Sequence, residues 1–134
     1  MKLGFTGTAK GMSARQLADF EVLIGGAHEL HHGDCVGADE QAHRLTCFVA
    51  RAVHIVVHPP SDDKARAYCS PGPWQTSMEV VEPKPYIQRN HDIVDAVDLL
   101  VAAPYTDEEV LRSGTWATVR YARKVGTGVV ILSR

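Results

Sequence analysis

Short apolar runs alternate with amphipathic stretches along most of the chain. The apolar runs have the length of strands and lie at 3–6, 29–33, 53–57, 98–103 and 128–132. Apolar residues recur at helical spacing between them, over 13–24, 38–52, 86–96 and 114–124. Strands that alternate with helices need crossover connections, which predict a parallel sheet covered on both faces.

The boundaries of these segments carry their own signals. Ser13-Ala14-Arg15-Gln16 has the form of a capping box and predicts a helix start, and Gly25-Gly26 predicts its end. Residues 61–79 are polar and contain Pro71-Gly72-Pro73, which indicates a loop with one helical turn. Val80-Val81 is a short extended piece after this loop. We therefore expect a single three-layer α/β domain over 1–134 with a mainly parallel sheet.

Composition narrows the class of protein. The 134 residues are 45% hydrophobic and carry a net charge of −2, which fits a globular domain rather than a disordered chain. The slight acidic balance argues against bulk electrostatic binding to nucleic acid or to an anionic membrane. No apolar run approaches the roughly 18–20 residues that cross a bilayer. Three cysteines at irregular spacing form no disulfide framework, so we expect a cytoplasmic protein without a membrane segment.

Ligands of parallel α/β sheets bind beyond the carboxyl ends of the strands, which directs attention to the turns that follow them. The first turn contains Gly7, Thr8 and Lys10. Glycine lets backbone N–H groups approach an anion, and Lys10 could reach a phosphate. The spacing is that of neither a P-loop nor a G-x-G-x-x-G fingerprint, so a tight turn without a ligand is the alternative.

The second turn, 33–39, carries two carboxylates beside Gly33. Asp34 ends a strand and is the better ligand candidate by position. Asp39 lies near a helix N-terminus, where it either binds a ribose or a water or simply complements the helix dipole.

A third turn and one helix start complete the candidate site. Ser113, Gly114 and Thr115 open a helix and form a natural phosphate cradle, although capping explains them equally well. Arg89 has the fork of donors that suits phosphate or carboxylate, and Asn90 either caps or reads a base edge.

The histidines invite a metal interpretation that their spacing does not support. His28, His31, His32 and Cys35 match neither a C-x-x-C nor an H-E-x-x-H pattern, so we expect no metal site. His58 ends a strand near the expected crevice and is a candidate acid or base.

Taken together, these segments resemble the SLOG superfamily. This Rossmann-like group holds the DprA DNA-processing proteins, the LOG phosphoribohydrolases and the YspA/YpsA-like proteins, and the order and spacing are most similar to the YspA-like members. The resemblance covers nearly the whole chain. The residues that carry it are Thr6-Gly7, His32-Gly33-Asp34-Cys35-Val36-Gly37-Ala38-Asp39, Arg89-Asn90, 98–104 and Ser113-Gly114-Thr115.

The resemblance implies a Rossmann-like fold, a nucleotide-like ligand and a homo-oligomer. Two departures argue against hydrolysis of the LOG type. LOG enzymes carry P-G-G-x-G-T-x-x-E, whereas Thr118 stands here at the position of the Glu and Ser113 replaces the glycine before Gly114. Asp34 also replaces the second glycine of the H-G-G pattern, which adds a carboxylate beside the expected site.

Three hypotheses about function follow. The first is binding of a nucleotide or nucleotide-derived small molecule, with phosphate on Gly114, Thr115 and Arg89 and ribose near Asp34 or Asp39. The second is hydrolysis of a nucleoside phosphate, with Asp34 or Asp39 stabilising the sugar cation or activating water. The third, single-strand DNA binding as in DprA, is disfavoured by 7% aromatic residues and the acidic balance. None of the three requires a cofactor or a metal beyond the ligand.

Overall fold

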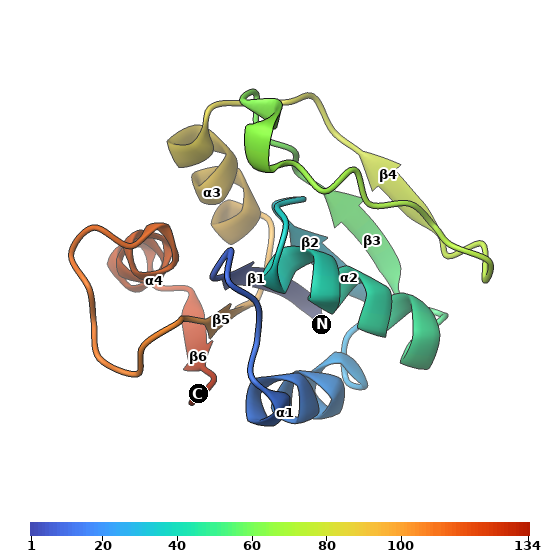
Figure 1. Ribbon diagram of the computed structural model, residues 1–134, viewed down its shortest axis with the longest axis horizontal. Helices are drawn as coiled ribbons and strands as arrows, with labels where there is room; N and C mark the ends of the chain where they lie inside the picture. Colours follow the sequence, from blue (N-terminus) through green and yellow to red (C-terminus); the bar gives the residue numbers. More distant parts are fainter.

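One six-stranded sheet organises the fold. The computed structural model describes all residues, 1–134 (Figure 1). Its strands in chain order are β1 (Lys2–Gly7), β2 (Glu29–His32), β3 (His54–Val57), β4 (Met78–Val80), β5 (Leu99–Ala103) and β6 (Gly128–Ile131). Every neighbouring pair is parallel, and the order across the sheet is β4-β3-β2-β1-β5-β6.

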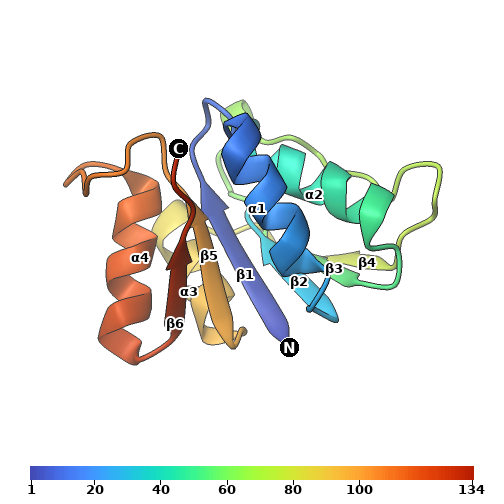
Figure 2. The same ribbon diagram turned by 90° about the horizontal axis from the view of Figure 1, so that it is seen from below.

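Two helices cover each face of the sheet. One face carries α1 (Ala14–Ile24) and α2 (Ala38–Val49), and the other carries α3 (Tyr86–Asp95) and α4 (Gly114–Val125) (Figure 2). The chain moves outward from β1 to β4 and then crosses back to β5, on the other side of β1. The strand order therefore reverses between β1 and β5, and a crevice opens beyond their carboxyl ends.

The alternation of side chains along the central strands builds two separate cores. Leu3 and Phe5 of β1 point toward α1 and α2, where the Phe5 ring meets Phe20 edge to face at 5.2 Å. Leu100 and Ala102 of β5 point the other way, into the cluster formed with α3 and α4. Both faces of the sheet are thus buried, as the continuous apolar runs predicted.

The capping box is present, and one of its residues also joins the sheet. Ser13 Oγ accepts the Gln16 N–H at 3.1 Å, and Gln16 Oε1 accepts the Ser13 N–H at 3.0 Å. The Gln16 Nε2 donates to the carbonyls of Pro104 and Leu132, beyond β5 and β6. The same Gln16 side chain that caps α1 therefore also links this helix to the ends of two strands.

The α/β prediction with a mainly parallel sheet is confirmed, with small shifts of boundary. The extended piece expected at 80–81 is β4, which begins at Met78 because Met78 pairs with Ile55 of β3. The helix expected to reach residue 52 ends at Val49. None of the helices combines the length and the apolar character needed to span a membrane.

Candidate functional site

A cavity of about 500 Å³, called here the central cavity, lies beyond the carboxyl ends of β1 and β5. Its walls come from the end of β1 and the following loop, the loop after β2, the starts of α2, α3 and α4, and the loop after β5. The structure brings together in this wall nine of the residues predicted from sequence: Gly7, Thr8, Gly33, Asp39, Arg89, Asn90, Ser113, Gly114 and Thr115.

The first loop is pressed against the start of α2. A Cβ atom on Gly7 would lie 2.5 Å from the Ala38 Cβ, and a Cβ on Gly37, whose φ is +91°, would overlap the Ala9 carbonyl. The Ala38 N–H donates to the Thr8 carbonyl at 3.0 Å. Glycine is required at both positions because two backbone segments meet there, and this contact shapes one wall of the central cavity.

Arg89 reaches from α3 into the centre of the site and is 6% exposed. Its Nη1 donates to the carbonyls of Gly33 and His58, and its Nε donates to Asn90 Oδ1 at 2.7 Å. The Nη2 contacts only Cys35 Sγ, at 3.9 Å. No carboxylate lies within 4.0 Å of the guanidinium, although buried charges are ordinarily paired.

Asp39 brings a buried carboxylate to the same wall. Its Oδ2 accepts the Cys35 N–H at 3.2 Å, whereas its Oδ1 is buried without any hydrogen-bond partner. Burial raises the pKa of Asp39 to about 6, against the opposing effect of the Arg89 charge. The carboxylate and the guanidinium face one cavity as opposite charges that are not paired with each other.

The start of α4 supplies backbone donors. Ser113 caps the helix by accepting the Trp116 N–H at 3.2 Å, while the N–H groups of Gly114 and Thr115 donate no hydrogen bond within the chain. A Cβ on Gly114 would meet nothing within 4 Å, so this end of the helix is open. The indole Nε1 of Trp116 is buried nearby without a partner. These donors and the helix dipole suit an anionic ligand.

Asp34 lies outside the cavity wall. Its φ is +58°, and its carboxylate accepts Arg66 Nε at 2.9 Å and the Cys69 N–H at 2.9 Å. The side chain is 1% exposed and holds the 61–77 loop against the end of β2. The structure thus explains Asp34 as a buried ion pair, and of the two predicted catalytic carboxylates only Asp39 reaches the cavity.

Lys10 is also outside the wall, at the mouth of the cavity. Its side chain is exposed, and its Nζ lies 4.1 Å from the centre of the Tyr105 ring. Tyr105 itself lines the cavity.

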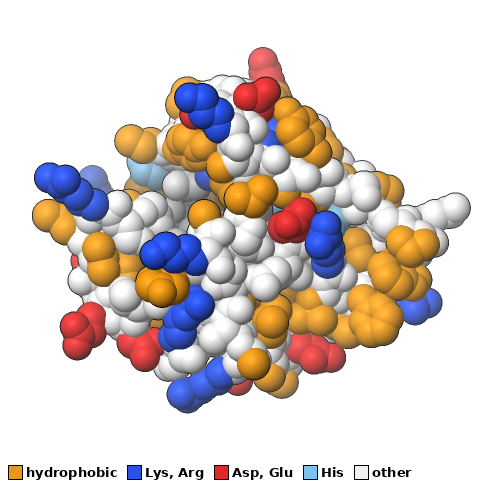
Figure 3. All heavy atoms as spheres, viewed as in Figure 1, with side chains coloured by type: hydrophobic (Ala, Val, Ile, Leu, Met, Phe, Trp, Pro, Cys, Tyr) orange, Lys and Arg blue, Asp and Glu red, His pale blue; other side chains and the backbone are white.

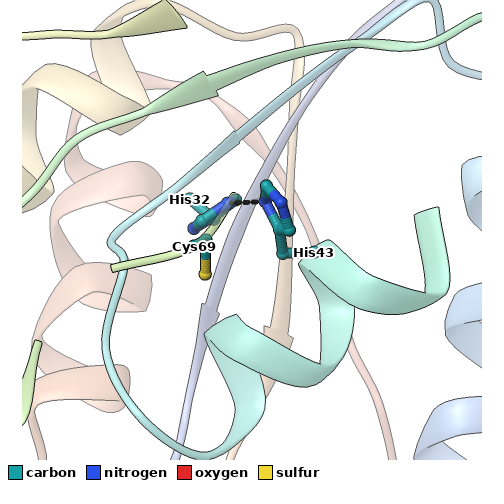
Figure 4. Close-up of side chains that lie close together, drawn as sticks. All are labelled: His32, His43 and Cys69. Atoms are coloured by element: carbon teal, nitrogen blue, oxygen red, sulfur yellow. Dashed lines mark hydrogen bonds between the residues drawn. The ribbon is translucent and has the colours of Figure 1, made fainter. Parts of the chain in front are cut away.

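The histidines considered for a metal site do not come together. His28 contacts the N-terminal amine, while His32, His43 and Cys69 place their ligand atoms within 4.8 Å of one another (Figure 4). The grouping combines β2, α2 and the 61–77 loop, so sequence spacing contained no signal for it.

Hydrogen bonds determine the protonation of this cluster. The Asp34 N–H donates to His32 Nδ1 at 3.0 Å, so the His32 proton is on Nε2 and is donated to His43 Nδ1 at 2.8 Å (Figure 4). His43 Nε2 then donates to the Ser70 carbonyl at 2.6 Å. Both rings are neutral and have no lone pair left for an ion. Burial and the neighbouring His43 lower the pKa of His32, in keeping with this chain.

His58 serves the site through its backbone. Its carbonyl accepts from Arg89, but its ring points to His31, with His58 Nε2 and His31 Nδ1 2.8 Å apart. His31 Nε2 in turn contacts the Glu29 carboxylate at 2.6 Å. Burial lowers the pKa of His58 to about 4. The ring does not line the central cavity, so the acid or base predicted at this position has no direct access to a ligand there.

Sequence reasoning did not assign the aromatic wall of the site. Tyr86, Tyr105 and Trp116 line the cavity, and Trp116 is 4% exposed. The available signal was position, since Tyr86 begins α3 and Tyr105 follows β5 within two residues.

Comparisons with known proteins agree with this architecture. No protein-family model and no curated protein matches the sequence. The molybdenum cofactor binding protein from the phototrophic bacterium Rippkaea orientalis superposes with a TM-score of 0.70 at 18% identity, over 99% of this chain and 76% of that chain.

Two further structures have the same arrangement. The structural-genomics target TM1055 superposes with a TM-score of 0.62 at 16% identity, over 96% of this chain and 71% of that one. DNA processing protein A (DprA) from Streptococcus pneumoniae superposes with a TM-score of 0.62 at 16% identity, over 97% of this chain and 49% of that one. This chain therefore spans about half of the DprA chain. The protein has the Rossmann-like fold of these structures, and its resemblance to the SLOG superfamily is supported at the level of the fold.

Proposed function

We propose that the protein binds a nucleotide or a nucleotide-derived small molecule in the central cavity. The observation that carries this proposal is the pair Arg89 and Asp39. Both are buried, both line the cavity, and neither forms an ion pair within 4.0 Å with the other or with another side chain. Unpaired buried charges are costly to folding, and a ligand that contacts both would offset that cost.

Arg89 and the start of α4 define the anionic part of this ligand. A guanidinium offers a planar fork of donors that matches phosphate. The free N–H groups of Gly114 and Thr115 add donors, and the 12-residue helix adds a partial positive charge at this end. A phosphate group satisfies all three requirements at once.

Asp39 and the aromatic side chains define the part of the ligand that is not phosphate. The unpartnered Asp39 Oδ1 needs a donor, which a ribose hydroxyl or a ring N–H supplies, and the Trp116 Nε1 needs an acceptor. Tyr86 adds an aromatic ring to the cavity wall, which suits a heterocycle. A cavity of about 500 Å³ lies within the usual size range of small-molecule sites, roughly 300–1,000 Å³.

The names of the neighbouring structures point to two classes of ligand, a small cofactor and a nucleic acid. One is described as a molybdenum cofactor binding protein and another as a DNA processing protein. The central cavity has a defined volume and few charges, and the chain carries a net charge of −2. These features favour a small anionic molecule over a nucleic-acid strand.

The decisive experiment combines native mass spectrometry with thermal shift. Purified protein is examined for a co-purified mass and is then titrated with AMP, GMP and inorganic phosphate. We expect the nucleoside monophosphates to raise the Tm more than phosphate alone, because they also contact Asp39 and the aromatic wall. No co-purified mass together with no shift from any nucleotide would contradict the proposal.

Asp39 supports a second candidate function, hydrolysis of the N-glycosidic bond of a nucleoside phosphate. A pKa of about 6 places this carboxylate close to the range in which a general base works near neutral pH. Water would add across the C1′–N bond, with its hydroxyl going to the sugar and its proton to the departing base. Release of free base from nucleoside monophosphates, abolished in Asp39→Asn, is the expected result; release that survives this substitution excludes Asp39 as the base.

A further inference from the structure

We propose that Lys10 and Arg134 form a second anion subsite around Tyr105 at the mouth of the central cavity, so that the ligand carries a diphosphate rather than a single phosphate. This inference rests on the proposed function and specifies its ligand. The first phosphate lies at Arg89 and the start of α4, and the second reaches outward past Tyr105.

Tyr105 connects the two positions. Its ring lines the central cavity, and the same ring contacts two cations, with Lys10 Nζ 4.1 Å and the Arg134 guanidinium carbon 4.5 Å from its centre. Arg134 also donates from Nη1 to the Gly11 carbonyl at 2.8 Å, next to Lys10 in the chain. Residues from the two ends of the sequence therefore meet at one rim of the cavity.

Neither cation has an anionic partner. No carboxylate lies within 4.0 Å of the Lys10 ammonium or the Arg134 guanidinium. The Asp107 carboxylate accepts from the backbone N–H of Arg134 at 2.8 Å rather than from its side chain. Both charges therefore remain free to bind an anionic group at this rim.

The surface around this rim agrees with the local geometry. Figure 3 shows Lys and Arg side chains gathered over the region between α1 and α4, whereas Asp and Glu side chains lie apart from this gathering, both toward the outline and nearer the centre of the face. The chain as a whole is slightly acidic, so this gathering is a local feature rather than a consequence of composition. It lies where a ligand leaving the cavity past Tyr105 would emerge.

A small diphosphate fits better than a nucleic-acid strand. A strand requires a groove of cations that continues along several nucleotides, with aromatic rings for successive bases. Here two cations meet at one exposed ring, Tyr105, and the other aromatic side chains of the site, Tyr86 and Trp116, line the cavity.

The test compares matched nucleotides that differ by one phosphate. Dissociation constants for AMP, ADP, GMP and GDP are measured by calorimetry without magnesium, for the full chain and for Lys10→Met, Arg134→Met and Lys124→Met. Lys124 lies in the last turn of α4, at the opposite end of that helix from the cavity, and is the matched control for charge. Lys10→Met removes an exposed side chain that makes no hydrogen bond or ion pair, so it is the variant least able to disturb the fold.

We expect the diphosphate of at least one base to bind about tenfold more tightly than its monophosphate, as charge-assisted contacts to a second phosphate imply. This ratio should fall toward one in Lys10→Met and Arg134→Met and should persist in Lys124→Met. If the monophosphate and the diphosphate of each base bind with equal affinity, or if the two variants leave the ratio of affinities unchanged, the inference is overturned while the proposed function stays in place. Absence of binding by all four nucleotides contradicts the proposed function itself.

A second experiment measures the affinity of the protein for single-stranded oligodeoxythymidines of increasing length. Affinity that increases with strand length and is lost in Lys10→Met and Arg134→Met would assign these cations to a strand instead, which also overturns the diphosphate inference. We expect no such dependence on length.

Discussion

The guanidinium of Arg89 lies directly against the backbone of Gly33. Its Nη1 donates to the Gly33 carbonyl, and a Cβ atom at position 33 would stand 2.6 Å from that nitrogen and 3.0 Å from Asp39 Oδ2. The absence of a side chain at Gly33 is therefore what allows a buried cation and a buried carboxylate to face the same cavity. Glycine is needed at position 33 because the Arg89 guanidinium approaches the backbone closely there, and no contact between Gly33 and a ligand has to be assumed.

Gly33→Ala tests that close approach. The added methyl group has no room unless Arg89 withdraws, so we expect loss of nucleotide binding and a free energy of unfolding lower by about 1–3 kcal/mol. Calorimetry and urea unfolding measure the two effects. Gly26→Ala is the matched control, because Gly26 lies outside the cavity wall and its Cβ would meet only the Leu23 carbonyl, at 3.7 Å. Full binding by Gly33→Ala would show that the contact is not required.

Arg89→Met removes the fork of donors from the centre of the cavity. We expect nucleotide affinity to fall by about two orders of magnitude, since a charge-assisted bidentate contact to phosphate is lost. The pKa of Asp39 should rise further, because the Arg89 charge is what opposes the effect of burial. Calorimetry measures the affinity and carbon-detected NMR titration measures the pKa. An unchanged affinity in Arg89→Met would remove Arg89 from the proposed phosphate site.

Asp39→Asn separates stability from function. Burial raises the pKa of Asp39 from 3.8 to about 6, so the folded protein carries a costly charge above that pH. We expect Asp39→Asn to increase the free energy of unfolding at pH 8, by up to about 3 kcal/mol for a shift of this size, while ligand affinity falls.

The sign follows from proton linkage. A carboxyl with a raised pKa contributes stability that is present below pH 3.8 and lost as the pH rises through 6, so the gain should vanish at pH 4. Urea unfolding of the full chain and of Asp39→Asn at pH 8 and pH 4 measures this difference in stability. Lower stability of Asp39→Asn at pH 8 would contradict the assignment of Asp39 as an uncompensated charge.

Asp34→Asn tests the ion pair with Arg66. The Asp34 carboxylate is buried and holds the 61–77 loop, so we expect a loss of about 3 kcal/mol in stability, typical of breaking a buried pair. Nucleotide binding should persist at a temperature where the variant is folded, because Asp34 is outside the cavity wall. Asp19→Asn, on the exposed side of α1, is the control. Normal stability with lost binding or base release would instead support the catalytic role predicted for Asp34.

Acid should destabilise the fold through its buried imidazoles. Burial lowers the pKa values of His31, His32, His43 and His58 from 6.5, so the unfolded chain binds more protons than the folded one below that pH. Their contribution to stability is present above pH 6.5 and is lost as the pH falls. The Asp39 effect has the opposite sign but involves one group. We expect the Tm to decrease steadily from pH 7 to pH 5 by differential scanning calorimetry.

A histidine variant distinguishes the contribution of the buried imidazoles to the acid-dependent decrease in Tm from that of other groups. His58→Asn removes a group whose pKa is lowered to about 4 and should make the decrease in Tm between pH 7 and pH 5 less steep. His54→Asn changes a histidine at the exposed end of β3 and serves as the control. A Tm that is constant or rises on acidification would contradict the prediction.

The sequence by itself determined the α/β architecture and the positions of the turns that line the central cavity. Apolar periodicity is a local property, so strands, helices and the Ser13 capping box could all be recognised without tertiary information. The carboxyl ends of parallel strands meet at one edge, and this rule brought Gly7, Gly33, Arg89 and Gly114 together correctly. Self-association stays a prediction of the family resemblance.

Only the tertiary structure decided which of the charged residues face the central cavity. The sequence favoured Asp34 over Asp39 by position, but the left-handed backbone at Asp34 turns its carboxylate to Arg66, 32 residues away. The first turn of α2 instead presents Asp39 to the cavity. Likewise, Lys10 and Arg134 meet at Tyr105 because β1, β5 and β6 end at one edge of the sheet. Side-chain direction at a turn and contacts between distant segments depend on how the whole chain folds, and no local pattern encodes them.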